Sequence, residues 1–255
     1  MKRLMLVLEH EFKSIVRKAA YGLLLAFTLC ISLLDSAPVP ANLQRLAWIS
    51  EPSYYATRVL TGGGILLAFG LIFLFSGRIA IDQKSGVIEL FKASSLQKAE
   101  YMAGKILGGF LSALCAYFIF LAACMSVYLL FLPEASVAAC LSAGIRSFLA
   151  VAAPASFFIS AVGICLPLLL DIRWTYVLTA LLLLANIFHI ESAAAEAPYL
   201  LLSGDLTKLV WQHPRFPFDN NIAIVMNLLF LLCGGAFPAG IVFAKNSYWR
   251  EKWKA

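Results

Sequence analysis

Residues Ile106–Leu132 read ILGGFLSALCAYFIFLAACMSVYLLFL and contain no Asp, Glu, Lys or Arg. About 20 such residues in a helix cross the roughly 30 Å hydrocarbon core of a membrane. The apolar residues run on without the alternation of a transmembrane β-strand, and a helix satisfies its own backbone amides in lipid. The stretch therefore predicts a membrane-spanning helix.

Five further apolar runs without charged residues point the same way. The chain of 255 residues is 62% hydrophobic and 13% charged, whereas soluble domains are about 45–50% apolar and about 25% charged. We therefore expect an all-α polytopic membrane protein in which residues 1–255 form a single transmembrane domain. The six expected spans are Ala19–Leu34, Val59–Gly77, Ile106–Leu132, Ser147–Leu170, Trp174–Ile190 and Ile222–Ala244.

Lys and Arg are distributed unevenly between the two sides of these spans. Fifteen of the 20 lie in the N-terminal segment, between spans 2 and 3, at Arg173 and in the C-terminal tail. Positive residues concentrate on the cytoplasmic side of membrane proteins, so we expect both termini in the cytoplasm. The charge is spread along the membrane edge, which suits acidic membrane lipid as a partner and argues against nucleic acid.

Residues 1–18 predict an amphipathic helix on the cytoplasmic membrane surface that leads into the first span. Glu9 precedes Lys13 by four residues, which is a favourable helical pair. Glu9 and Glu11 distinguish this segment from the short basic start of a signal peptide. The alternative is a polar tail without regular structure. The apolar residues expected to share one helical face are Leu4, Leu8, Phe12, Ile15 and Ala19.

Two long segments are expected on the opposite side of the membrane, 35–58 and 191–221. Both mix Trp, Tyr and Pro with few charges, and Trp and Tyr favour the membrane–water interface. Within the second, Pro198–Trp211 is too short to cross a membrane but apolar enough to be buried. We therefore expect an interfacial or re-entrant helix there.

Few residues are arranged for catalysis. The sequence has no GxxxxGK[ST] loop, no HExxH or GxSxG motif, and no CxxC among its six cysteines. Asn186 and His189 share a helix face near the outer end of the fifth span, and they are candidates for a substrate path. The alternative is that both bond to neighbouring helices or to interfacial water. We expect no catalytic residue, no metal and no cofactor in this chain.

Residues 76–105, between spans 2 and 3, read SGRIAIDQKSGVIELFKASSLQKAEYMAGK. We refer to them as the 76–105 segment. The pattern predicts a helix, a break at Gly86, a short helix, a turn at Ser94-Ser95, and a new helix that leads to Gly104-Lys105. The segment resembles the coupling segment in the membrane subunits of type-2 ABC exporters. The matching positions are Asp82, Gly86-Val87-Ile88-Glu89, Leu90-Phe91, Ser95, residues 98–101 and Gly104-Lys105, with Val87 and Ser95 where that family usually has Thr and Pro.

The resemblance implies a permease subunit that forms half of an export path in the bacterial cytoplasmic membrane. A cytoplasmic ABC ATPase dimer would bind the ATP and magnesium, and a second copy or a paralogue of the permease would complete the path. The residues implied to couple to the ATPase are Asp82, Gly86, Ile88, Glu89, Leu90, Phe91 and Lys92.

An apolar bundle without charges in its spans favours a hydrophobic or amphipathic cargo such as a lipid, a peptide or a drug. Three alternatives remain: a non-transporting assembly subunit, an intramembrane enzyme and a channel. An enzyme needs convergent polar residues and a channel needs a polar lining, and the spans offer little of either.

Overall fold

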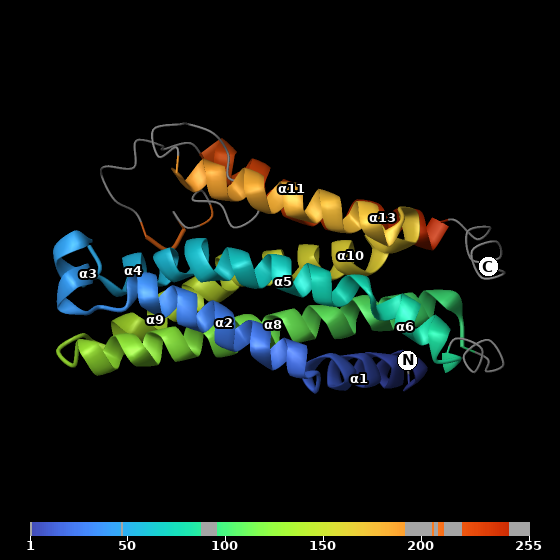
Figure 1. Cartoon of the computed structure of the whole chain (residues 1–255), viewed down its shortest axis with the longest axis horizontal. Helices are drawn as coiled ribbons and strands as arrows, with labels where there is room; N and C mark the ends of the chain where they lie inside the picture. The colour runs from blue at the N-terminus through green and yellow to red at the C-terminus, as the bar shows by residue number, and fades with distance from the viewer. Residues whose placement is uncertain are drawn as a thin grey trace.

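The computed structural model describes residues 2–46, 48–87, 96–191, 206, 209–211 and 221–244. Every regular element in these ranges is a helix, and the long helices lie side by side in an elongated bundle (Figure 1). The elements are α1 (Lys2–Val16), α2 (Ala19–Ser36), α3 (Pro40–Arg45), α4 (Pro52–Val59), η1 (Leu60–Gly64), α5 (Ile65–Ser76), α6 (Arg78–Lys84), α8 (Lys98–Phe131), α9 (Val137–Ser147), η2 (Phe148–Ala152), α10 (Ala153–Leu169), α11 (Ile172–Glu191) and α13 (Asn221–Ala244).

Five continuous helices in the described ranges are long and apolar enough to cross a membrane. The remaining expected span, Trp174–Ile190, falls in α11, whose backbone is helical over its whole length. The apolar part of α11 with described surroundings, Ile172–Ala185, is shorter than a crossing, so this fifth span stays a prediction. The five helices are Ala19–Ser36, Pro52–Asp82, Lys98–Phe131, Val137–Leu169 and Ile224–Ala244.

Large apolar side chains cover the outside of the bundle. Soluble monomers rarely expose contiguous apolar patches of more than a few hundred Å², whereas in a bilayer such side chains contact lipid. The exposed outer faces of α2, α11 and α13 include Leu23, Phe27, Trp174, Leu181 and Phe237. This distribution agrees with a multi-pass membrane protein.

Two of the long helices begin before the apolar runs that predicted them. Pro52 opens α4, which continues through η1 into α5, whereas the span was expected from Val59. Val137 opens α9, which continues through η2 into α10, whereas the span was expected from Ser147. Proline fits the first turn of a helix without losing a hydrogen bond. Ser136 caps α9, since its hydroxyl accepts from a backbone N–H three residues on (3.4 Å).

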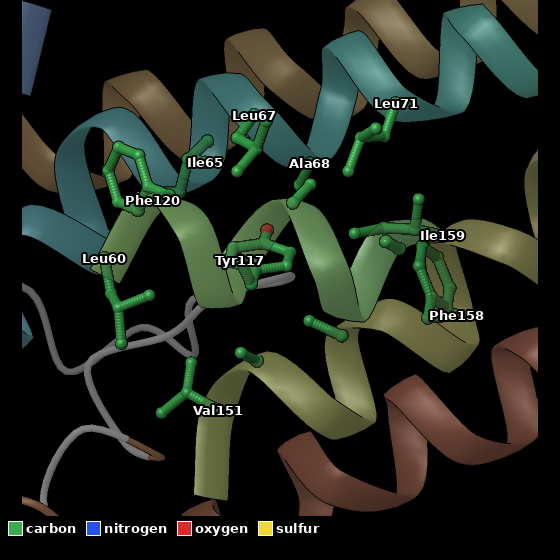
Figure 2. Close-up of a cluster of buried hydrophobic side chains, with 14 of the residues drawn as sticks. Leu60, Ile65, Leu67, Ala68, Leu71, Tyr117, Phe120, Val151, Phe158 and Ile159 are labelled. Carbon is green, nitrogen blue, oxygen red and sulfur yellow. The ribbon is translucent and has the colours of Figure 1, made fainter. Parts of the chain in front are cut away.

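The core lies between α5, α8 and α10. Figure 2 shows Leu67 and Leu71 of α5 above Tyr117 of α8, with Ile159 of α10 on the same level. Tyr117 is fully buried, and its hydroxyl donates to the carbonyl of Gly64 at the end of η1 (2.9 Å). The tyrosine thereby satisfies a backbone group within the apolar core.

The bundle has two different ends. One holds α1, α6, the start of α8 and the end of α13, and we call it the α1 end (Figure 1). There Lys98 Nζ donates to the carbonyl of Val242 (2.8 Å), which caps the last turn of α13. The opposite end, called the α3 end, holds α3, α4 and the start of α9. There Asp35 binds both Arg45 (3.0 Å) and Arg58 (2.9 Å), so the expected segment 35–58 is folded onto the bundle.

Little of the expected segment 191–221 is described. Leu206 and Trp211 are buried, and the Trp211 indole N–H donates to the Glu51 carboxylate at the start of α4 (2.9 Å). This contact places the described part of the segment at the α3 end. The expected re-entrant helix Pro198–Trp211 otherwise lies outside the described residues.

The N-terminal segment is helical as expected, and its buried face coincides only in part with the expected apolar face, with which it shares Ile15. α1 lies lengthwise along the first turns of α8 (Figure 1), and its most buried positions are Val7, Glu11 and Ile15. A Cβ added at Gly104 would lie 2.7 Å from Val7 Cβ, and one at Gly108 would lie 2.7 Å from Glu11 Cβ. The two glycines therefore allow α1 to approach α8 closely, as small residues do between membrane helices.

Replacing Gly108 with valine is expected to push α1 away from α8, because the added side chain would overlap Glu11. Overpacking of this kind destabilises by about 1–3 kcal/mol, and the measurement is the melting temperature of the purified protein in detergent. The matched control is Gly22→Val, since an added Cβ at Gly22 has nothing within 4 Å. Equal losses at both positions would contradict the role assigned to the α1–α8 contact.

Candidate functional site

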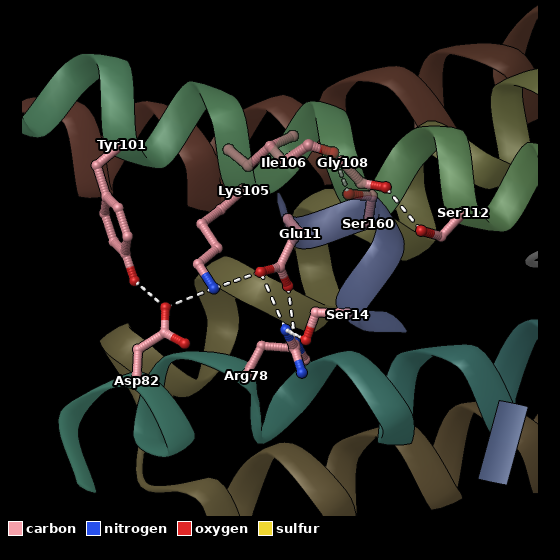
Figure 3. Close-up of polar contacts among 10 residues, drawn as sticks. All are labelled: Glu11, Ser14, Arg78, Asp82, Tyr101, Lys105, Ile106, Gly108, Ser112 and Ser160. Atoms are coloured by element: carbon pink, nitrogen blue, oxygen red, sulfur yellow. Dashed lines mark hydrogen bonds and ion pairs between the residues drawn. The ribbon is translucent and has the colours of Figure 1, made fainter. Parts of the chain in front are cut away.

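Four charged side chains are buried together at the α1 end, and we call them the charge cluster (Figure 3). They are Glu11 of α1, Arg78 and Asp82 of α6, and Lys105 of α8, and none is more than 4% exposed. Two are negative and two are positive, so their formal charges balance. A buried charge is tolerated only when it is paired and hydrogen-bonded, so these contacts decide whether the α1 end is stable.

Glu11 is shared by cations from two different helices. Arg78 donates from Nε to Oε1 (2.6 Å) and from Nη2 to Oε2 (3.1 Å), and Lys105 Nζ also donates to Oε2. Burial acts to raise the pKa of Glu11, but the hydrogen bonds and charges of Arg78 and Lys105 outweigh it and hold the pKa below its ordinary value. The Glu11 carboxylate is therefore ionised at neutral pH.

The remaining contacts connect all three helices. Arg78 Nη2 also donates to Ser14 Oγ (2.7 Å), so the described hydrogen bonds of its guanidinium all go to α1. Asp82 contacts α8 instead: Lys105 Nζ lies 2.5 Å from its Oδ2, and the Tyr101 hydroxyl donates to the same oxygen (2.6 Å). Helix α6 is thus held to α1 by its arginine and to α8 by its aspartate.

Helical spacing places these groups on facing surfaces. Arg78 and Asp82 are four residues apart on α6, and Tyr101 and Lys105 are four apart on α8, so each pair shares one helix face. Gln97 begins α8 with a reciprocal capping box, in which its side chain and that of Glu100 bond to backbone N–H groups. The local sequence therefore fixes where α8 starts, and hence which of its residues face α6.

The structure describes two of the seven expected coupling residues, Asp82 and Gly86. Asp82 lies inside the chain, in the charge cluster, and not on the surface where it would contact an ATPase. Gly86 follows α6 with φ +71°, a left-handed conformation that favours glycine, so the expected break is confirmed. The other expected coupling residues lie outside the described ranges: Ile88, Glu89, Leu90, Phe91 and Lys92.

The candidates for a substrate path are only partly described. Asn186 and His189 lie on the helical backbone of α11, and their side-chain surroundings are outside the described part of the chain. Within the described ranges, no three His, Cys, Asp or Glu side chains are grouped so that they could hold a metal ion.

An apolar groove of about 440 Å³ lies between α8 and the α9–η2 helix. Carbon atoms form nearly all of its surface, and its lining includes Phe118, Met125, Leu141 and Phe148. Such a groove can accommodate an apolar group, but it offers no acid or base.

The sequence did not single out most of the charge cluster. From the sequence, Glu11 only distinguishes residues 1–18 from a signal peptide. Tyr101 and Lys105 are only matching positions within the resemblance. One signal was present in α1, because Glu11 occupies the helical stripe of Val7 and Ile15 at four-residue spacing. A charge on an otherwise apolar stripe indicates a buried partner.

Comparisons of the chain with known protein families, with curated proteins and with solved structures found no match. The charge cluster and the 76–105 segment therefore form the basis for a functional assignment.

Replacing Glu11 with glutamine is expected to destabilise the protein by about 3–5 kcal/mol, since removal of one partner leaves a buried charge uncompensated. Thermal unfolding in detergent measures the effect. Glu9→Gln is the matched control, because Glu9 lies on the same helix and pairs with Lys13 at the surface (2.5 Å). We expect no measurable change for the control, and similar losses in both variants would argue against the cluster.

The Glu11 contribution is also expected to depend on pH. Its pKa is lower in the folded protein than in the unfolded chain, so its stabilisation is complete above about pH 4.3 and is lost as the pH falls through the folded value. The difference in melting temperature between the natural protein and Glu11→Gln should stay constant at neutral pH and shrink below about pH 4. A difference that grows on acidification would contradict the assignment.

Proposed function

We propose that the chain is the permease subunit of an ATP-driven ABC exporter in the bacterial cytoplasmic membrane, with both termini in the cytoplasm. The observation that carries the proposal is the anchoring of the 76–105 segment at both of its ends. Arg78 and Asp82 hold the outgoing helix α6, and Tyr101 and Lys105 hold the incoming helix α8. A segment between two fixed helices transmits a displacement to the bundle, whereas a loosely attached loop absorbs it.

Contacts to other helices extend this argument. Glu11 connects the two anchors to α1, and Lys98 connects the start of α8 to the end of α13. Helices from the beginning, the middle and the end of the chain therefore meet beside the 76–105 segment. A protein that pushes on this segment would act on all of them at once, as an exporter requires.

The proposal assigns the energy source to a partner. The sequence has no GxxxxGK[ST] loop, so ATP and magnesium would bind a separate cytoplasmic ABC ATPase dimer. The break at Gly86 would present the short helix expected around Glu89 and Phe91 to a groove of that ATPase. A second copy or a paralogue of the permease would complete the path.

Two observations favour a hydrophobic or amphipathic cargo over an ion. The groove between α8 and α9 is almost wholly apolar. Buried polar side chains along the described spans are largely uncharged and include Thr28, Ser112, Ser156 and Ser160. Asn186 and His189 remain the candidate path residues, and a fixed charge that would attract a small ion is missing from the middle of the described spans.

The variants Glu89→Arg and Phe91→Asp are expected to weaken association with the ATPase. Each reverses or introduces a charge on the expected short helix, and a loss of about 1.4 kcal/mol already lowers affinity tenfold. The measurement is the amount of ATPase that co-purifies with the tagged permease when both are expressed together. The control is Glu134→Arg, the same exchange at an exposed position at the α3 end.

Full co-purification with both variants would overturn the coupling assignment. If the natural complex hydrolyses ATP but reconstituted vesicles move no lipid, peptide or drug, the chain is a non-transporting assembly subunit. If no ATPase binds the natural protein, the exporter proposal is wrong, and a channel or an enzyme becomes the better assignment.

A further inference from the structure

The charges of α6 can pair in two ways. In the structure, Arg78 is bonded to Glu11 and Ser14 of α1, and Asp82 is bonded to Lys105 and Tyr101 of α8. Yet Arg78 and Asp82 lie four residues apart on one helix, which is the spacing of an intrahelical ion pair. The docked α1 thus holds Arg78 in contacts that leave Asp82 available to α8.

We infer that α1 is a releasable clamp that controls the junction between α6 and α8. When α1 leaves, Arg78 loses the partners described for it and pairs with Asp82. The Asp82 carboxylate then binds Arg78 on its own helix in competition with Lys105 and Tyr101 of α8. The partner exchange loosens the α6–α8 junction and frees both ends of the 76–105 segment, and this holds whether or not the chain is a permease.

The construction of α1 fits such a role. A break at Arg17–Lys18 separates α1 from α2, since Lys18 adopts an extended backbone (φ −72°, ψ 133°). α1 packs chiefly on α8 and makes few contacts with α2, so it can move as one unit. Lys18 adds a further positive charge beside the cluster, where burial and Arg78 lower its pKa. Because Lys18, Arg78 and Lys105 are all positive, α1 can stay packed on α8 only while the Glu11 carboxylate offsets part of their charge.

The inference is tested by the distance between α6 and α8. Spin labels at Lys84→Cys and Ala99→Cys, both exposed and outside the charge cluster, flank the central part of the 76–105 segment. The labels are placed in the full chain, with the accessible cysteines Cys30, Cys115 and Cys233 replaced by serine. Pulsed electron paramagnetic resonance in lipid nanodiscs then gives the distance distribution. We expect a narrow distribution for this parent protein and for Glu9→Gln, and a broad one for Glu11→Gln.

A second substitution tests whether Arg78 competes with α8 for Asp82. Adding Arg78→Gln to Glu11→Gln removes the competitor for Asp82 and leaves Lys105 and Asp82 as a balanced pair, so the narrow distribution should return. If Glu11→Gln does not accumulate in the membrane, the same pair of variants is compared by accumulation, which the second substitution should restore. The inference is overturned if Glu11→Gln matches Glu9→Gln, or if the double variant is no better than Glu11→Gln alone.

Discussion

Two buried cations share one carboxylate at the α1 end, and the arrangement of three helices depends on it. Removing an ion from water costs several kcal/mol even after relaxation of the protein, so Arg78 and Lys105 can be buried side by side only where Glu11 reaches both and Asp82 completes the charge balance. That reach requires the close approach of α1 to α8 at Gly104 and Gly108. It also requires that α6 turn its arginine toward α1. The glycines and the charges therefore serve one constraint.

Polar contacts matter more here than they would in a soluble bundle. Inside a membrane, two apolar helix faces gain little free energy when they exchange lipid for each other, because the acyl chains are as apolar as leucine. The positions of the helices are therefore set by close packing and by polar contacts. The core between α5, α8 and α10 illustrates the first kind of contact, since a Cβ added at Gly163 of α10 would lie 2.8 Å from Phe75 Cβ of α5. The charge cluster illustrates the second. The two kinds divide the bundle into a close-packed middle and an end held by ions.

The sequence predicts the spans well and the charge cluster poorly, for physical reasons. Lipid demands long uncharged runs, so composition alone locates α2 and α8. Helix starts such as Pro52 and Val137 lie outside those runs, so a hydropathy argument misses them. Within α1, the exposed pair of Glu9 and Lys13 is predicted from spacing and confirmed at 2.5 Å. The partners of Glu11 are 67 and 94 residues away, and no local pattern identifies them.

The long sequence separation between Glu11 and its partners also affects how the protein is made. Arg78 follows it by 67 residues and Lys105 by 94. At about 5–20 residues per second, the ribosome adds the last of these partners roughly 5–20 s after Glu11. Until then the carboxylate lacks its full set of buried partners, so α1 can reach its final place only after the start of α8 has been made.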